Sequence, residues 1–402
     1  MIKDFIFKKY HFDEKTGILT LSYQADDLYS FEEKITFPGA PFSIKNQVIL
    51  DKCLHLLHIA AGISYYKAVS ADNVIVETQP LLPKEASFFD VFYLMGLGQF
   101  AYQNNVDLRG KIHFPSVQGS FNEKFLLPVG TFVPVGGGKD SCVTIELLKR
   151  KNKNLTAISV NTARPIEDCK RISGLNSITI LREISPELLD KSKSFYNGHV
   201  PITGILAFVM MTACVLYGKN EIAMSCESSA NEGNLEMGGM TVNHQWSKSE
   251  EFERIFMDLV HDFLPNFKYH SFLRAYREID IARLFAQNCS AYFEAFTSCN
   301  HAFHIDKAKR LDRWCGDCDK CRFVFLILAP FMDKKVLTRV VGHDLLDDEK
   351  QKQGYRELLG LSGHKPFECV GTVDECREAF AMFCTHEEWQ NDKLVRELAD
   401  EL

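Results

Sequence analysis

The first part of the chain alternates between apolar and polar residues from Asp4 to Gln24, with a polar break at Asp13 to Gly17. Alternation of period two predicts strands that have one buried face. We therefore expect two strands joined by a turn at that break. The next stretch, residues 46–68, carries apolar residues at helical spacing and predicts a helix. This part of the chain is expected to form a smaller α+β N-terminal region.

From about Thr131 the pattern changes to short, continuous apolar runs that alternate with helical stretches. The runs of strand length are residues 131–135, 155–162, 177–184 and 221–227, and the helical stretches are 140–151, 201–217 and 250–264. Strands buried on both faces that alternate with helices predict a parallel sheet with right-handed crossovers. The expected fold class is α/β, a parallel sheet with helices on both faces, after the α+β N-terminal region. We divide the chain into residues 1–125, 126–345 and a helical or loop extension, 346–402.

One apolar stretch, Val200 to Gly218, carries no charge over its length and just reaches the span of a membrane. It contains Pro201 and Gly204, and strand-like segments flank it, so a buried helix of a layered protein is the preferred interpretation. The start of the chain mixes charged and apolar residues and lacks the apolar core of a signal peptide. These features predict a cytoplasmic protein with no membrane partner.

The composition fits a globular protein that acts on a small molecule. Apolar residues make up 46% of the 402 residues, and the net charge of -7 is spread without long like-charge blocks. An acidic protein without a basic stripe is not expected to bind nucleic acid. Thirteen cysteines in a chain without an export signal predict reduced thiols together with one metal cluster. The oligomeric state is left open.

Three glycines, Gly136 to Gly138, stand between a predicted strand and a predicted helix in "FVPVGGGKDSCVTIELLKR". The familiar NTPase loop needs an earlier glycine where Val133 stands and a Ser or Thr where Asp140 stands. A glycine-rich strand-to-helix loop nevertheless lets backbone N–H groups converge on an anion. Ser141 adds a hydroxyl, and either Asp140 or Ser141 could cap the helix. Phosphate binding is predicted.

The motif "GGGKDS" resembles the loop of the N-type ATP pyrophosphatases, whose usual form is Ser-Gly-Gly-any-Asp-Ser, and Gly136 replaces the first Ser. Members of that superfamily cleave ATP between the α and β phosphates, adenylate a substrate oxygen and release pyrophosphate. The resemblance implies an adenine nucleotide alpha hydrolase-like fold with ATP and Mg²⁺ as cofactors, Mg²⁺ lying at Asp140. It also implies nucleotide binding by Gly136, Gly137, Gly138, Lys139, Asp140 and Ser141.

A polar segment, Ser225 to Glu251, follows a predicted strand, where ligand loops of parallel sheets lie. Its mixture of amides, a histidine, Trp and Met favours substrate binding over a solvated surface loop. The expected substrate-binding residues are Asn231, Asn234, Asn243, Gln245 and Lys248. His199, which precedes the buried helix, is a weaker candidate because a lone histidine is more often structural.

Three cysteines lie close together in "CGDCDKC": Cys315, Cys318 and Cys321. Two such spacings in a row suit a compact thiolate site, with Cys299 as the expected fourth zinc ligand. Cys289, His301 or His304 could replace Cys299, and three reduced cysteines at a helix start are the alternative. The motif resembles the four-cysteine site of the 7-cyano-7-deazaguanine synthases, and that resemblance implies a structural zinc.

Several motifs together, "VGGGKDS", "NEGN", "VNHQWSKS", "CGDCDKCRFVFLILAPFM" and "GHKPFECVG", resemble the UDP-N-acetylmuramoyl-L-alanyl-L-glutamate epimerases of bacterial peptidoglycan synthesis. The resemblance implies conversion of the terminal L-Glu of a UDP-linked dipeptide to D-Glu, while ATP becomes AMP and pyrophosphate. Adenylation would turn the carboxylate into a neutral mixed anhydride, whose α-proton is far more acidic.

Inversion needs a base and an acid on opposite faces of the α-carbon. The candidates are His244, Glu227, Glu232, His199 and His364, and Lys139 or Lys248 could balance charge on the phosphates. A cysteine could act as one partner or form a thioester. Two other hypotheses remain: adenylation of another acceptor, such as a nucleobase or tRNA base, ending in ligation or thiolation, and a zinc-stabilised binding protein with a degenerate nucleotide loop.

Overall fold

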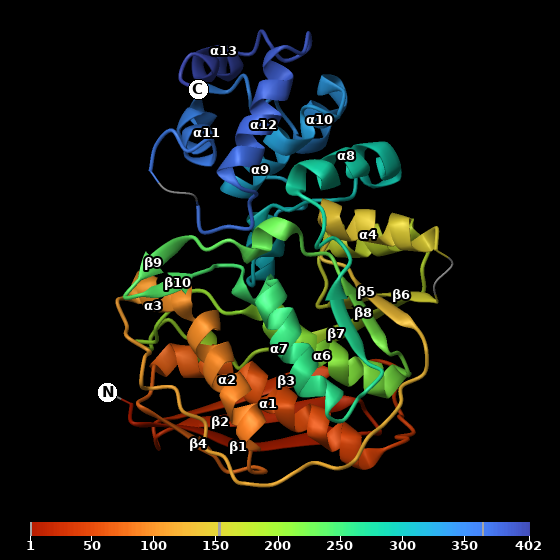
Figure 1. Cartoon of the computed structure of the whole chain (residues 1–402), viewed down its shortest axis with the longest axis vertical. Coiled ribbons are helices and arrows are strands. Elements are labelled where there is room, and N and C mark those ends of the chain that lie inside the picture. Colours follow the sequence, from red (N-terminus) through yellow and green to blue (C-terminus); the bar gives the residue numbers. More distant parts are fainter. Residues whose placement is uncertain (1, 152–153, 364–365) are drawn as a thin grey trace. The chain divides into compact units, whose positions relative to one another are not determined.

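The computed structural model of the chain describes residues 2–151, 154–363 and 366–402 (Figure 1). It divides into two compact units, each made of segments that are separated in the sequence. Unit 1 comprises Met1–Phe132, Ile178–Ile222 and Asn231–His270, and unit 2 comprises Val133–Ser177, Ala223–Ala230 and Ser271–Leu402. The division of the sequence at residues 125 and 345 stays a prediction.

Unit 1 begins with the antiparallel strands β1 (Asp4–Asp13), β2 (Ile18–Ala25) and β3 (Tyr29–Thr36), and β4 (Asn73–Val76) runs parallel to β1. The first two strands and the turn between them confirm the prediction from the alternating pattern. In β2 every second side chain is fully buried, because one face of the sheet is covered by a helix.

That helix is α1 (Gln47–Val69), which also confirms a prediction. The Asn46 side chain caps it by accepting from the backbone N–H of Ile49 at 3.1 Å. A Cβ added at Gly62 would come within 2.3 Å of the Phe7 ring of β1, so the helix lies close to the sheet only because this residue is glycine. The helix is long and apolar enough to cross a membrane, but 89% of its apolar window is buried inside the protein.

The remaining elements of unit 1 include four helices and a small hairpin. They are α2 (Pro83–Gly96), α3 (Gly98–Asn104), α6 (Ile202–Tyr217), α7 (Glu250–His261), β9 (Leu235–Met237) and β10 (Met240–Val242). Helix α6 is the apolar stretch that reaches membrane length in the sequence. It packs against α1 with most of its side chains buried, which confirms the prediction of a buried helix.

The other strands are β5 (Thr131–Pro134), β6 (Leu155–Val160), β7 (Ser177–Glu183), β8 (Glu221–Met224) and β11 (Lys268–Ser271). The hydrogen-bonded order in the sheet is β11-β8-β5-β6-β7-β3-β2-β1-β4, and β5 runs parallel to β8. The fold is α/β, with a large, mostly parallel sheet flanked by helices and an antiparallel N-terminal region, as expected at that level.

Strand β7 differs from its prediction. It pairs antiparallel with β3, where Thr36 is opposite Leu181, and most of its side chains are exposed or half-buried. The sequence pattern suggested a strand buried on both faces. The apolar run did not predict burial correctly, because the Leu181 side chain is exposed. The guanidinium of Arg182 pairs with a buried carboxylate, that of Glu33 in β3.

Unit 2 is mainly helical (Figure 1). Its helices are α4 (Lys139–Lys149), α5 (Arg164–Ser173), α8 (Glu278–Asn288), α9 (Asp319–Leu328), α10 (Lys334–Val341), α11 (Lys352–Leu358), α12 (Val373–Cys384) and α13 (Lys393–Ala399). Helix α9 is buried on nearly all sides because α8, α10, α11 and α12 pack around it. Short 3-10 turns complete the chain: Pro186–Leu189, Ser228–Asn231, Trp246–Lys248, Ser290–Tyr292, Asn300–Phe303, Lys307–Lys309 and Glu349–Gln351.

Candidate functional site

The glycine loop of unit 2 connects β5 to α4, as predicted from the sequence. Gly137 has φ +83°, and a Cβ there would lie 3.0 Å from Cβ of Pro165 and 3.1 Å from the backbone N of Ile166. Both the backbone conformation and the space therefore require glycine. Gly136 is exposed, and a Cβ at this position would have no atom of the other described residues within 4 Å, its two chain neighbours aside. The two glycines thus have different structural roles.

The start of α4 differs from the prediction that Asp140 or Ser141 would cap it. The N-cap residue is Gly138, and no side chain among the described residues accepts a hydrogen bond at this cap. The Ser141 hydroxyl instead donates to the carbonyl of Gly138 at 3.0 Å, because Ser141 lies inside the first turn. A helix start without a side-chain cap suits an anion, which would accept from the first backbone N–H groups.

Lys139, the first residue of α4, is buried and makes two ion pairs. Its Nζ lies 2.5 Å from Oδ1 of Asp140 and also contacts a carboxylate oxygen of Glu278. Asp140, Glu227 and Glu278 each offer one carboxylate oxygen, and these three oxygens all lie within 4.8 Å of one another. Unit 2 therefore gathers three carboxylates and one ammonium at the start of α4.

The charges of this group are not balanced among the four side chains. Burial by itself lowers the pKa of Lys139. The carboxylates of Asp140 and Glu278 raise this pKa by a larger amount, so it lies above its ordinary value. Burial raises the pKa of Glu278; Lys139 partly offsets this, whereas the carboxylates of Asp140 and Glu227 add to it. Lys139 thus stays charged, and an additional cation would relieve the crowding of carboxylates.

Glu278 was not foreseen from the sequence. It is the first residue of α8, and its backbone N–H donates to Oε1 of Glu375 at 2.6 Å. Glu375 also closes a capping box with Thr372 at the start of α12. The pattern Thr-x-x-Glu at residues 372–375 is a local signal that could have placed the start of α12. No local signal marks Glu278, because its partners are far away in the sequence.

Glu227, predicted as a proton-transfer candidate, is buried in unit 2 beside Lys139's partners. Its Oε1 accepts from the Ser229 hydroxyl at 3.2 Å, and its backbone carbonyl accepts from Nη1 of Arg274 at 2.9 Å. The side chain is therefore held within the carboxylate group. Its geometry suits a cation ligand as well as a proton acceptor.

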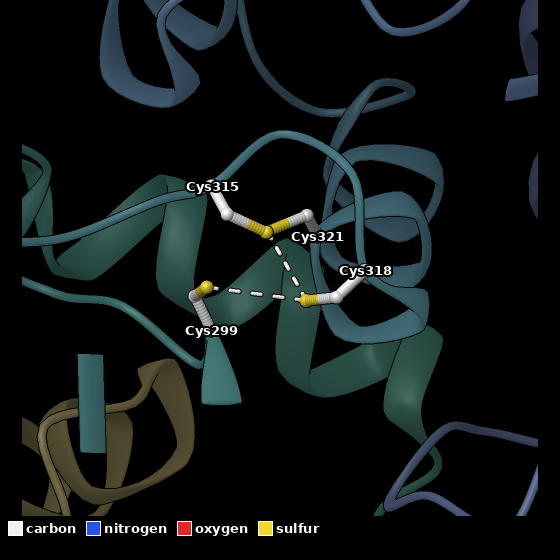
Figure 2. Close-up of side chains that lie close together, drawn as sticks. All are labelled: Cys299, Cys315, Cys318 and Cys321. Carbon is white, nitrogen blue, oxygen red and sulfur yellow. Dashed lines mark hydrogen bonds between the residues drawn. The ribbon is translucent and has the colours of Figure 1, made fainter. Parts of the chain in front are cut away.

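The four cysteines singled out in the sequence lie together in unit 2 (Figure 2). The Sγ atoms of Cys315 and Cys321 are 3.7 Å apart, those of Cys318 and Cys321 3.5 Å, and those of Cys318 and Cys299 3.9 Å. All four Sγ atoms lie within 4.8 Å of one another. We call this group the cysteine cluster.

Cys299, rather than the other candidates for the fourth position, is the residue found in the cysteine cluster. Cys289 is buried at the end of α8, within the hydrophobic core of unit 2. His301 and His304 are exposed, and Nδ1 of His304 accepts from the backbone N–H of Asp306. None of these three belongs to the group of possible metal ligands among the described residues.

The polar segment from Ser225 to Glu251 is more ordered than the predicted loop. It contains the hairpin of β9 and β10, whose two-residue turn is Gly238-Gly239 with φ +57° and +80°. Two glycines with positive φ are typical of a tight hairpin turn, so the Gly-Gly pair was a local signal that the sequence analysis missed. Residues up to Ala230 belong to unit 2, and those from Asn231 belong to unit 1.

His199 and His244 lie side by side in unit 1, with ring centroids 4.5 Å apart. Nδ1 of His244 is 2.5 Å from Oε1 of Gln99, and the backbone N–H of His244 donates to Asn234. Burial lowers the pKa of His199 to about 3, and the neighbouring His244, Lys248 and Lys67 lower it as well. His199 is therefore neutral at physiological pH and lies in a positively charged environment.

The amides predicted to bind substrate also hold the segment in shape. Asn231 accepts from the backbone N–H of Glu250, Asn234 from that of His244, and Asn243 from that of Gln245. The Gln245 side chain is buried and its Oε1 accepts from Nζ of Lys248 at 3.4 Å. Glu232, another proton-transfer candidate, is exposed.

A cavity of about 600 Å³ opens in unit 1 beside this segment. Two of the predicted substrate-binding residues, Asn231 and Asn243, line it. Its other lining residues are Met95, Gly233, Thr241, Trp246, Ser249, Glu250, Glu251 and Arg254. His364, also a predicted proton-transfer residue, lies outside the described residues.

In an α/β fold, a glycine turn that leads into a buried lysine and three carboxylates is typical of an enzyme site. Comparison with known families agrees: a family model described as the MurL N-terminal domain matches residues 1–272, and one described as the MurL C-terminal domain matches residues 295–402. The chain therefore belongs to the MurL family.

Curated relatives give the family an activity by name. A protein of Xanthomonas oryzae pv. oryzae is 39% identical over 401 residues, which cover 98% of this chain and 89% of that protein. Relatives from Salinispora tropica and a Micromonospora species are 40% and 38% identical, again over 98% of this chain and 88% and 90% of their own lengths. Each is named a UDP-N-acetyl-alpha-D-muramoyl-L-alanyl-L-glutamate epimerase. The resemblance to this epimerase family is confirmed; membership of the ATP pyrophosphatase superfamily stays a prediction.

Proposed function

We propose that the chain is an epimerase that inverts the α-carbon of the terminal glutamate in UDP-N-acetylmuramoyl-L-alanyl-L-glutamate, from L to D. The observation that carries this proposal is the 38–40% identity to three epimerases of that name over 98% of the chain. The substrate is accordingly a small molecule of peptidoglycan precursor synthesis.

We further propose that the reaction consumes ATP and passes through an acyl-adenylate. Removal of an α-proton beside a free carboxylate would create a second negative charge on the same group, which is very unfavourable. Attack of the glutamate carboxylate oxygen on the α-phosphorus forms a mixed anhydride and releases pyrophosphate. The anhydride has no net charge on the carboxyl group, so its α-proton is removed more easily. A second group returns a proton to the opposite face of the α-carbon, and water then hydrolyses the anhydride to the D-glutamate product and AMP.

The glycine loop of unit 2 supports this proposal. The uncapped first turn of α4 offers backbone N–H groups to phosphate oxygens, and Gly137 gives the tight turn that this approach requires. Ser141 lies within the same turn, and its hydroxyl would be a further donor after leaving the carbonyl of Gly138. We assign the β and γ phosphates, the leaving pyrophosphate, to this turn.

The carboxylate group fits Mg²⁺, because oxygen ligands are those this ion prefers and the group carries more carboxylates than ammonium groups. Asp140 and Glu227 would hold the ion together with phosphate oxygens. When bound, Mg²⁺ neutralises phosphate charge and orients the leaving pyrophosphate. Lys139 holds Asp140 and Glu278 in place, since its ammonium is shared between them.

For proton transfer we favour His244, because the contact with Gln99 fixes the orientation of its ring and the ring lies against His199. His199 is a weak base in this environment, since burial lowers its pKa to about 3. We therefore give it a positioning role against the His244 ring. Glu232 and His364 remain candidates for the second proton-transfer group, and so does a cysteine.

The cavity of unit 1 is proposed to receive part of the UDP-linked substrate. Its amides, Asn231 and Asn243, and the guanidinium of Arg254 offer donors to the uridine or sugar, while Trp246 offers an aromatic face. Lys248, close to His199, is proposed to contact one of the substrate's anionic groups.

The direct test is to incubate the protein with ATP, Mg²⁺ and the UDP-linked dipeptide in D₂O. We expect AMP and pyrophosphate, D-glutamate in the product, and deuterium at its α-carbon. Epimerisation without AMP would remove the adenylate step but keep the epimerase. Absence of both deuterium and D-glutamate would reject the proposed function, and AMP formed only with a nucleobase or tRNA acceptor would favour that alternative.

A further inference from the structure

We propose that the cysteine cluster binds one Zn²⁺ as a closed tetrathiolate site, and that this site fixes the segment on which the glycine loop rests. The first part is independent of the proposed epimerisation. The second concerns the geometry of the loop, whether or not the loop binds ATP.

The distances between sulfur atoms fit a single tetrahedral metal ion. A tetrahedral Zn²⁺ with Zn–S bonds of about 2.3 Å places each pair of sulfurs about 3.8 Å apart. Three of the Sγ–Sγ distances in the cysteine cluster are 3.5, 3.7 and 3.9 Å. A disulfide would need about 2.0 Å, and a cluster of several irons would hold its cysteine sulfurs farther apart because the ligands bind different irons. The spacing of the sulfurs therefore fits one ion.

The local sequence builds this arrangement. Gly316 has φ +71°, and this turn brings Cys315 back towards Cys318. The backbone N–H of Asp317 donates to Sγ of Cys315 at 3.3 Å, a hydrogen bond typical of metal-bound thiolates. Cys318 is the N-cap of α9, and Cys321 lies in its first turn, where the helix dipole stabilises negative charge on sulfur.

The cluster has the character of a structural site. Cys299 and Cys321 are buried, and Cys315 and Cys318 are half-buried. Four protein ligands fill a tetrahedron, so no position is left for water or substrate, as in structural rather than catalytic zinc sites. Because Cys299 comes from a different segment than the other three, the ion would tie two parts of unit 2 together (Figure 2).

The segment tied by Cys299 contacts the glycine loop. The backbone N–H of Thr297 donates to the carbonyl of Gly137 at 2.9 Å, and the backbone N–H of Cys299 donates to Oγ1 of Thr297 at 3.1 Å. A Cβ added at Gly138 would lie 3.1 Å from the hydroxyl of Ser298. Removal of the ion would therefore loosen residues 297–299 and, through them, the turn that begins α4.

The first experiment measures metal by mass spectrometry in the full chain purified without added zinc. We expect about one zinc per chain, since the four thiolates form one site, and a loss of most of it in Cys318→Ser. The matched control is Cys384→Ser, which removes a half-buried thiol of the same unit outside the cluster and should retain the zinc. A wild-type protein with far less than one zinc, or with iron instead, would overturn the assignment.

If Cys318→Ser does not fold, the wild-type protein still gives an answer. Replacement of the metal by Co²⁺ should produce the intense visible bands of tetrahedral cobalt together with thiolate-to-cobalt charge transfer. Weak bands typical of octahedral cobalt would contradict a tetrathiolate site.

Hydrogen–deuterium exchange tests the second part, without use of activity. Metal removal with a chelator should increase exchange in peptides that cover residues 136–141 and 297–299, while peptides of α1 in unit 1 serve as the control. Faster exchange near Cys315 to Cys321 with no change at residues 136–141 would show that the metal does not support the glycine loop. That result would overturn the second part of the proposal and keep the first. Loss of epimerase activity alone would decide nothing here, so failure of this proposal and failure of the proposed function are distinguishable.

Discussion

Lys139 is the residue on which the site of unit 2 depends most. It is nearly fully buried, and its ammonium is shared by Asp140 and Glu278. Removal of one partner of a buried ion pair leaves the other charge uncompensated, which costs more than the pair contributed. Lys139 therefore affects both the stability of unit 2 and the proposed chemistry.

The first prediction concerns Lys139→Met. We expect AMP formation to fall roughly 100-fold or more, because a preorganised charge near the phosphates is lost, and the midpoint of thermal unfolding to fall as well. Lys149→Met is the matched control, since Lys149 is exposed in the last turn of the same helix and its ion pair, with Glu146, lies away from the carboxylates. A Lys139→Met variant that forms AMP at the wild-type rate would exclude the lysine from the site.

At the scale of elements, the glycine turn before α4 shows how far a motif can be understood from sequence. Gly136 is the position at which the chain departs from the usual Ser of the ATP pyrophosphatase motif. The structure places it in open space without positive φ, whereas Gly137 is confined by Pro165 and Ile166. The replacement of the usual Ser by Gly136 therefore changes no packing contact of the loop.

The second prediction is a comparison of Gly136→Ser with Gly137→Ser. The first should fold normally and keep AMP formation within a few-fold of wild type, because the side chain meets nothing. The second should destabilise unit 2 by at least about 1 kcal/mol through the strained backbone alone. Urea unfolding and AMP release measure the two effects; equal behaviour of the variants would show that the turn is not as described.

The pairing of β3 with β7 rests on a buried ion pair. Nε and Nη2 of Arg182 donate to the two carboxylate oxygens of Glu33 at 2.7 and 2.9 Å, and the Tyr65 hydroxyl also donates to Glu33. The Glu33 side chain is fully buried. This bidentate contact explains why a strand with few buried apolar side chains holds its position.

The third prediction follows from this contact. Arg182→Met should lower the free energy of unfolding by about 3–5 kcal/mol, because Glu33 would remain buried without its cation. The exposed pair of Lys34 and Glu32 on β3 is the control, and Lys34→Met should cost no more than about 1 kcal/mol. The double variant Arg182→Met with Glu33→Gln should recover part of the loss; if it does not, the charge is not the cause.

Local patterns predicted some of the strands and helices, and distant contacts explain two of the failures. The alternation before Gln24, the helical spacing from Asn46 and the spacing of Cys315, Cys318 and Cys321 are all visible within a few residues. Glu278 was missed because it meets Lys139 across 139 positions. The antiparallel partner of β7 was missed for the same reason, since β3 lies far upstream. The Gly238-Gly239 hairpin, by contrast, had a local signal.

For the molecule as a whole, low pH is expected to reduce the stability of unit 1 because two histidines of α1 are buried. Burial lowers the pKa of His55 to about 3, with further lowering by Lys52 and His58. Burial lowers the pKa of His58 to about 4, although its contact with the carbonyl of Ser22 opposes the shift. Both are therefore neutral in the folded protein at pH values where the unfolded chain binds protons.

The fourth prediction is that the free energy of unfolding falls as the pH is lowered. Between pH 6.5 and about 4 the unfolded chain holds more protons at these positions, so stability is complete above pH 6.5 and falls as pH falls below it. Each histidine should contribute a loss of about 1.4 kcal/mol between pH 7.5 and 5.5. Urea unfolding at the two pH values measures it.

The variant His55→Phe should reduce that pH dependence, whereas His11→Phe, at an exposed position of β1, should leave it as in the wild type. An unchanged pH dependence in His55→Phe would mean that this histidine is not buried in the neutral form.

The discontinuous make-up of unit 2 has a consequence for its biosynthesis. The buried ammonium of Lys139 meets Glu278 across 139 positions, and Glu278 in turn is held by Glu375. At about 5–20 residues per second, a ribosome needs roughly 7–28 s to add the intervening chain. During that time the glycine turn exists without its acidic partner, so a nascent chain released near residue 272 would carry the recognisable motif but no site.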